Sequence, residues 1–155
     1  MRVLLAVDGS PYSEAAISEV ANREWPWGTE IRILSAFEMP LPATPEAWAL
    51  PPKYMDEIEQ AGRNNAKRIV ERAQEKVSQK VGDAVKIESK FVVGSPKNVI
   101  LEEADNWNAD LIVLGSHGYS AWERFLLGSV SQGVVSHAKC SVEVARLKKE
   151  QVAVA

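Results

Sequence analysis

The sequence predicts an α/β fold, in which a single domain holds an open, five-stranded parallel sheet with helices on both faces. The main observation is that strand-length apolar runs alternate with helix-length segments in the order β-α-β-α-β-α-β-α-β. Two of these runs, Val3–Val7 and Leu111–Leu114, are uninterrupted, which is typical of parallel strands covered on both faces. The length of 155 residues is sufficient for one sizeable core.

The expected elements follow from apolar periodicity and from helix start and stop signals. In chain order they are a strand at 3–7, a helix from Pro11 to about Glu24, a strand at 31–37, a helix from Lys53 to about Lys80, a strand within 85–93, a helix from Pro96, a strand at 111–114, a helix from Ser129 and a short strand at 142–145.

Local residue chemistry explains several of these boundaries. Ser10-Pro11 and Ser95-Pro96 each place a serine at the N-cap and a proline at the first helical position. Gly82 is expected to end the longest helix. The strand within 85–93 alternates apolar with charged residues, so one of its faces should be exposed. The proline-bearing segment 40–52 is expected to be a long connection in which 45–48 could form one helical turn. Loops of this length in compact domains are often functional or mobile.

Composition excludes several classes of protein. The formal net charge of −3 argues against a nucleic-acid binder, which would show a basic face. Cys140 is the single cysteine, so no intramolecular disulfide can form, and a reducing intracellular setting is expected. The first apolar run is too short to span a bilayer and no cleavage site follows it. We therefore expect a cytoplasmic protein with no membrane partner.

The segment from Asp110 to Ser131 has the pattern of a phosphate-binding loop between a strand and a helix. Gly115 ends the strand where a ligand could approach the backbone, and Gly118 is a second point where positive φ is allowed. Gly128-Ser129 then opens a helix, whose first N–H groups attract phosphates. The alternative is that these are three ordinary turn glycines.

The pattern Gly115-x2-Gly118-x9-Gly128-Ser129 is similar to the ATP-binding signature of the universal stress protein family, at full spacing. The resemblance runs from Val3 to about Arg146. It implies a Rossmann-like fold of the adenine nucleotide alpha hydrolase kind, with strand order 3-2-1-4-5. It also implies a universal stress protein domain over 1–147, a flexible tail at 148–155 and a homodimer formed through the last strand, Val142–Ala145.

The resemblance further implies a set of nucleotide-binding residues. These are Asp8, Ala36, Leu114, Gly115, Gly118, Gly128, Ser129, Val130 and Ser131. With strands one and four adjacent, Asp8 and Gly115 should meet at the crevice where ligands bind in such sheets. Asp8 has an alternative role in an Asx-turn. Ala36 matches a backbone contact to adenine, where a larger aliphatic residue is common in the family, so the pocket should be roomier here.

The sequence also suggests roles for four side chains outside this set. His117, inside the loop, is expected to have an orienting rather than a catalytic role, and His137, near a helix end, a structural one. Arg124 could reach the outer phosphates, or it could simply be exposed beside Glu123. Cys140 has the place of a small apolar residue.

The motifs of fast phosphoryl transfer are missing. The sequence has no Walker motif, no G-x-G-x-x-G after the first strand, no zinc-site spacing and no nucleophile elbow. We therefore assign no catalytic and no metal-ligating residue. The first hypothesis is an ATP-binding, nucleotide-responsive regulator in stress adaptation with at most slow hydrolysis. A bound triphosphate usually brings Mg²⁺ with it. A partner-binding homodimeric adaptor, with nucleotide structural or absent, and a slow nucleotide hydrolase remain as alternatives.

Overall fold

Five parallel strands form one sheet within the part of the chain that the computed structural model describes, namely residues 1–40, 44–118 and 127–147. The sheet order is β3-β2-β1-β4-β5, as expected. The strands are β1 (Arg2–Ala6), β2 (Glu30–Phe37), β3 (Lys86–Val93), β4 (Leu111–Gly115) and β5 (Ser141–Ala145).

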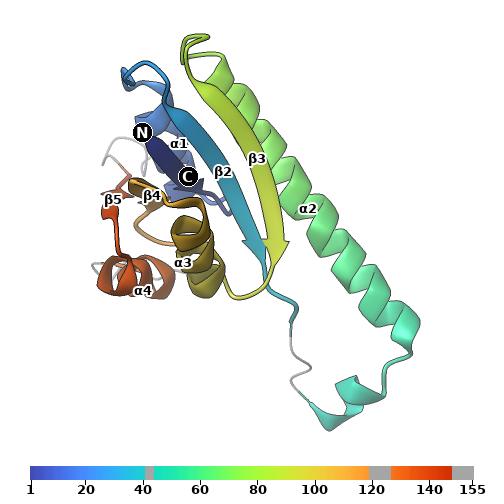
Figure 1. Cartoon of the computed structure of the whole chain (residues 1–155). Coiled ribbons are helices and arrows are strands. Elements are labelled where there is room, and N and C mark those ends of the chain that lie inside the picture. Colours follow the sequence, from blue (N-terminus) through green and yellow to red (C-terminus); the bar gives the residue numbers. More distant parts are fainter. Residues whose placement is uncertain (41–43, 119–126, 148–155) are drawn as a thin grey trace.

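Helices cover both faces of the sheet, so the predicted α/β fold is confirmed. Helices α1 and α2 pack on one face, and α3 and α4 pack on the other (Figure 1). Their bounds are α1 (Pro11–Ala21), α2 (Pro52–Ser78), α3 (Pro96–Trp107) and α4 (Ser129–His137), with a short 3₁₀ helix, η1 (Pro45–Ala49), at the expected helical turn.

Strand β1 shows why the uninterrupted apolar runs are central. Val3 and Leu5 belong to the core under α1 and α2, whereas Leu4 and Ala6 belong to the core under α3 and α4. Successive side chains of a strand point to opposite faces, so a strand covered on both sides has no polar position. The same arrangement holds for β4, where Val113 and Ile112 face the two cores.

Two helix ends differ from the expectation. Helix α1 ends at Ala21 rather than near Glu24; Asn22 is its C-cap, and the backbone N–H and the side chain of Asn22 both donate to the Ser18 carbonyl, the side chain at 2.8 Å. Helix α2 ends at Ser78, with Gln79 as its C-cap. Gly82 therefore does not end the helix; it lies in the turn that follows.

The two serine–proline helix starts use different chemistry. The Ser10 hydroxyl accepts a hydrogen bond from the Ser13 N–H at 3.2 Å, which confirms it as a side-chain cap. Ser95 occupies the N-cap of α3, but its side chain makes no capping hydrogen bond. In the second case proline alone favours the start of the helix.

The start of α2 extends past the carboxyl edge of the sheet, together with η1 (Figure 1). Trp48 and Tyr54 on this projection are exposed. No helix of the described residues is long and apolar enough to cross a membrane.

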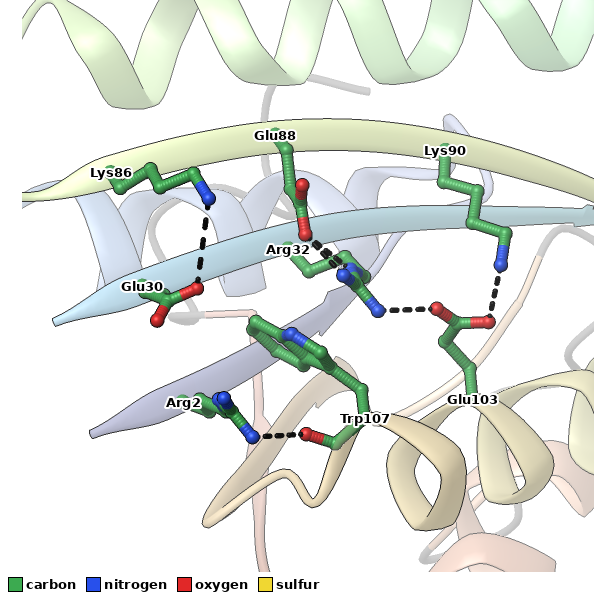
Figure 2. A network of polar contacts seen from close by, with 8 residues as sticks. All are labelled: Arg2, Glu30, Arg32, Lys86, Glu88, Lys90, Glu103 and Trp107. Atoms are coloured by element: carbon green, nitrogen blue, oxygen red, sulfur yellow. Dashed lines mark hydrogen bonds and ion pairs between the residues drawn. The ribbon is translucent and has the colours of Figure 1, made fainter.

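A cluster of charged side chains fills the amino-terminal end of the sheet face beneath α3 (Figure 2). The Arg32 guanidinium lies 4.2 Å from the centre of the Trp107 ring and is 2.7 Å from a Glu103 carboxylate oxygen. It also pairs with Glu88 from the neighbouring strand β3, and Lys90 reaches the second Glu103 oxygen at 2.8 Å. This end of the face is closed by paired side chains.

Candidate functional site

A cavity of about 480 Å³ opens at the carboxyl ends of β1, β2 and β4, on the α3–α4 face of the sheet. Strands β1 and β4 are neighbours here, at the point where the winding of the sheet reverses. Parallel α/β sheets bind ligands at this topological position.

One part of the cavity is apolar and lined by small side chains. Ala6 and Ala36 contribute single methyl groups from the ends of two adjacent strands, and Leu34 and Leu114 form the neighbouring wall. Ile100 on α3 adds a further apolar side chain. A flat aromatic ligand group fits such a hollow, because apolar walls with few polar groups are typical of cofactor sites.

The opposite part of the cavity is formed by the start of α4. Gly128 is the N-cap residue and Ser129 is the first residue of the helix. The N–H groups of the first helical turn have no intrahelical acceptor, and a glycine cap has no side chain to bind them. The helix dipole adds partial positive charge at the same place, so this end of the cavity can bind an anion.

Hydrogen bonds hold the two described ends of the glycine-rich segment together. The Ser116 carbonyl accepts from the Gly128 N–H at 2.7 Å and lies 2.8 Å from the Ser131 hydroxyl. The Ser116 N–H donates to the Ala145 carbonyl at 2.8 Å. The buried hydroxyl of Ser131 therefore holds the loop in place. Only the backbone of Ser131 remains available to contact a ligand. Residues 119–126 lie outside the described residues, and with them Glu123 and Arg124.

Two glycines have roles that differ from those expected. A Cβ on Gly115 would lie 2.6 Å from the backbone carbonyl of Tyr12, so this glycine lets α1 pack closely on β4. Gly118 does not have positive φ; instead, a Cβ there would lie 3.0 Å from Asp8 Oδ2. Gly115 is therefore required by the close approach of the α1 backbone, and Gly118 lies in close approach to the Asp8 side chain.

Asp8 forms the expected Asx-turn and also lines the cavity. Its Oδ1 accepts a hydrogen bond from the Ser10 N–H at 2.9 Å, which confirms the Asx-turn. Its other oxygen lies beside Gly118, and the residue lines the cavity. The turn therefore orients one carboxylate oxygen toward the site.

The two histidines and the cysteine have the following surroundings. The His117 ring lines the cavity, lies 5.0 Å from the Tyr12 ring and has Nδ1 3.0 Å from the Ser116 hydroxyl. His137 Nδ1 lies 2.8 Å from the Gly133 carbonyl, one turn back in α4. Cys140 packs partly against the α3–α4 core, and burial raises the pKa of its thiol.

The structure places all nine predicted site residues around this one cavity. Lining it are Asp8, Ala36, Leu114, Gly115, Gly118, Gly128, Ser129, Val130 and Ser131. Sequence reasoning missed the wall formed by Pro96 and Ile100 at the start of α3. The available signal was the serine–proline helix start directly after β3, because the start of a crossover helix lies at the same edge of the sheet as the site. Within the described residues no group of His, Cys, Asp or Glu side chains is arranged to hold a metal ion.

Comparison with known proteins gives the family. The family model described as the universal stress protein family matches residues 1–146. The chain belongs to the universal stress protein family. Universal stress protein YxiE of Bacillus subtilis (strain 168) is 30% identical over 148 residues, which cover 94% of this chain and 98% of YxiE.

Solved universal stress protein structures share the fold. UspA from Lactobacillus plantarum has a TM-score of 0.78 and 29% identity, with 94% of this chain and 97% of that chain covered. A universal stress protein in complex with cAMP has a TM-score of 0.58 and 26% identity, with 94% and 96% covered. The Rossmann-like sheet described above is thus the architecture of the family.

Proposed function

We propose that this universal stress protein binds ATP, or another adenine nucleotide, in the cavity at the carboxyl ends of β1, β2 and β4. The observation that carries the proposal is the pairing of a small-residue apolar hollow with the start of α4 in one cavity. Apolar walls suit the base, and N–H groups at a helix start suit the phosphates. A solved relative in complex with cAMP supports adenine nucleotides as the ligand class.

The proposed pose follows from the two ends of the cavity. The adenine base lies against Ala36 and Leu114, and the phosphates lie at the amides of Ser129 and Val130. The outward carboxylate oxygen of Asp8 is placed for the ribose hydroxyls. Mg²⁺ enters with the triphosphate, because a bound triphosphate usually brings a divalent cation. No lysine occupies the place of a P-loop lysine in the sequence motif, so hydrolysis should be slow at most.

We further propose that the nucleotide acts as a signal rather than as a substrate. Binding at Ser129 would bias the hydrogen bonds that join Gly128 and Ser131 to Ser116, and so the arrangement of the glycine-rich segment. Such coupling requires that the ligand binds two arrangements with different affinity. This mechanism fits a regulator in stress adaptation, for which a cytoplasmic location is the expected setting.

The edge strand β5 supports a homodimer, which both the regulator and the adaptor hypotheses include. It pairs with β4 on one side, and among the described residues no strand pairs with its other side. Open strand edges template further pairing, and pairing with a second copy through Val142–Ala145 would be isologous. In the adaptor hypothesis the nucleotide is structural or absent, so this hypothesis depends only on the open edge of β5.

Titration calorimetry of the nucleotide-free chain with ATP, ADP and AMP, with and without Mg²⁺, tests the proposal. The sharpest variant is Ser129→Pro, because proline suits the first helical position and the extended Gly128 (ψ 163°) suits a residue before proline. It removes one phosphate-facing N–H without disturbing the helix. Ser129→Ala is the matched control, because it removes only the hydroxyl.

We expect micromolar ATP affinity that falls at least about tenfold in Ser129→Pro, a loss of about 1.4 kcal/mol of binding free energy. The decrease should be much smaller in Ser129→Ala. Gly115→Val is a poor choice of variant, because its side chain would collide with the Tyr12 backbone. Absence of binding at millimolar nucleotide, or equal affinity in wild type and Ser129→Pro, would overturn the proposal and leave the dimer-edge adaptor as the better hypothesis.

A further inference from the structure

A second hollow, of about 500 Å³, lies between α1 and α2 on the opposite face of the sheet from the candidate nucleotide site. We call it the α1–α2 groove. Ile17 from α1 and Ile69 from α2 provide apolar surface, and Arg68 and Arg72 provide the charged rim. Gly9, which follows Asp8 of the nucleotide site, marks its end nearest the carboxyl edge of the sheet.

The two arginines are placed to act together. They are one helical turn apart, and residues at this spacing are neighbours on one face of a helix. Among the residues that the structure describes, Arg68 donates only to the Asn65 side-chain oxygen, at 3.2 Å, and Arg72 makes no hydrogen bond or ion pair. By contrast, the guanidinium groups of Arg23, Arg32 and Arg63 are each paired with a carboxylate.

The acidic residue of the groove is already neutralised. Glu14 lines the groove on the α1 side, and its carboxylate forms an ion pair with Lys76 of α2. The charged residues that face the groove are therefore two arginines and one carboxylate that has its own cation. The lining residues of the groove thus carry more positive than negative charge, although the whole chain is acidic, at −3.

We propose that the α1–α2 groove binds the phosphate group of a small phosphorylated molecule, as a second site separate from the nucleotide cavity. Guanidinium groups present planar pairs of N–H donors that match phosphate oxygens, and charge-assisted hydrogen bonds of this kind are the stronger ones. Ile17 and Ile69 offer contact to a short apolar part of the ligand. The proposal does not depend on nucleotide binding in the other cavity.

NMR titration of the full ¹⁵N-labelled chain with inorganic phosphate and pyrophosphate tests this site, because each signal reports its own position. Saturable shifts are expected at the Gly9 and Ile69 amides and at the side-chain Nε–H groups of Arg68 and Arg72. Sodium chloride at matched ionic strength measures the general salt effect.

Arg68→Gln and Arg72→Gln should each weaken pyrophosphate binding at these amides by at least about fivefold, as expected for loss of a charge-assisted contact. Lys67→Gln is the matched control, because it removes the same charge from the same helix at an exposed position whose partner, Glu71, is 3.8 Å away. Shifts that chloride reproduces, or that the three variants change equally, would overturn the site. So would shifts confined to Gly118 and Ser129, which would place the anion in the nucleotide cavity instead.

Discussion

The two ends of the sheet face beneath α3 differ in how their space is filled. At the carboxyl end, Ala6 and Ala36 leave a cavity of about 480 Å³. At the amino end of the same strands, Arg32 and Trp107 fill the corresponding space, and Glu103 neutralises the guanidinium. The same strands and the same helix thus produce a site at one end and a sealed surface at the other.

The direction of the helices explains the division of roles. Helices α3 and α4 start at the carboxyl end of the sheet, where their N–H groups favour anions, and their carbonyl ends lie toward the other edge. There the Arg2 guanidinium donates to the Trp107 carbonyl at 3.0 Å, near the last turn of α3. The polarity of the helices therefore places ligand-binding donors at the open end and acceptors for arginine at the filled end.

The largest effect should come from opening the filled end. Arg32→Ala leaves the Glu103 carboxylate, whose side chain is only 10% exposed, with Lys90 as its one remaining ion-pair partner among the described residues. The free energy of unfolding should fall by about 3 kcal/mol, as expected when one partner of a largely buried pair is removed. Urea denaturation measures the change, and ATP affinity of the folded variant should equal that of wild type.

The control for Arg32→Ala is a double variant that removes the charges of Arg32 and Glu103 together. In Arg32→Met/Glu103→Leu no uncompensated charge stays buried, so most of the lost stability should return, to within about 1 kcal/mol of wild type. Loss of ATP affinity in either variant, with the protein still folded, would contradict the independence of the two ends.

The next largest effect should come from Gly115→Ala at the open end. The new methyl group would lie 2.6 Å from the Tyr12 carbonyl, so α1 must move away from β4. Overpacking of this kind costs about 1–3 kcal/mol of unfolding free energy, which thermal or urea unfolding detects. A variant as stable as wild type would show that the close packing of α1 on β4 is unimportant.

A large side chain in the apolar part of the cavity should change nucleotide affinity more than it changes the free energy of unfolding. Ala36→Phe puts an aromatic ring into the cavity from the end of β2, so affinity for ATP and for AMP should fall about tenfold or more, because both share the base. The unfolding free energy should change by less than about 1.5 kcal/mol, since the ring enters open space. Calorimetry and urea denaturation separate the two outcomes; unchanged affinity would mean that the base lies elsewhere.

The smallest effect concerns Cys140, which precedes β5 at the filled end of the sheet. Burial raises the pKa of its thiol, so less thiolate forms at pH 8 and alkylation by iodoacetamide should be slower than in the urea-unfolded chain. Because the pKa of the Cys140 thiol is higher in the folded than in the unfolded chain, the free energy of unfolding should decrease as the pH rises above the ordinary thiol pKa of about 8.5. Cys140→Ala should flatten that decrease; equal alkylation rates in folded and unfolded protein would contradict the burial of the thiol.

Sequence reasoning succeeded where local chemistry decides the structure. The apolar runs of β1 and β4, the Ser10 cap and the turn at Asp8 each depend on neighbouring residues, and each was predicted. The strand order was implied by the family resemblance, not by the residues themselves. It predicted that Asp8 and Gly115 lie at one crevice, and both residues line the cavity.

The features that were missed depend on contacts between distant parts of the chain. Gly115 is required by Tyr12, which precedes it by most of the sequence, and Arg32 is paired with Glu103 across 71 positions. The Ser131 hydroxyl is turned inward to Ser116. No local pattern distinguishes a glycine or serine that serves a ligand from one that serves the fold.

Ser116 connects the edge strand β5 to the cavity through its backbone hydrogen bonds. The peptide N–H of this residue is held by Ala145 at the end of β5, and its carbonyl holds the first turn of α4 through Gly128 and Ser131. The end of β5 and the start of α4 are therefore joined through the backbone of a single residue. Any displacement of the β5 edge would be transmitted to the helix start through Ser116, and a displacement of the helix start would be transmitted to the edge in the same way.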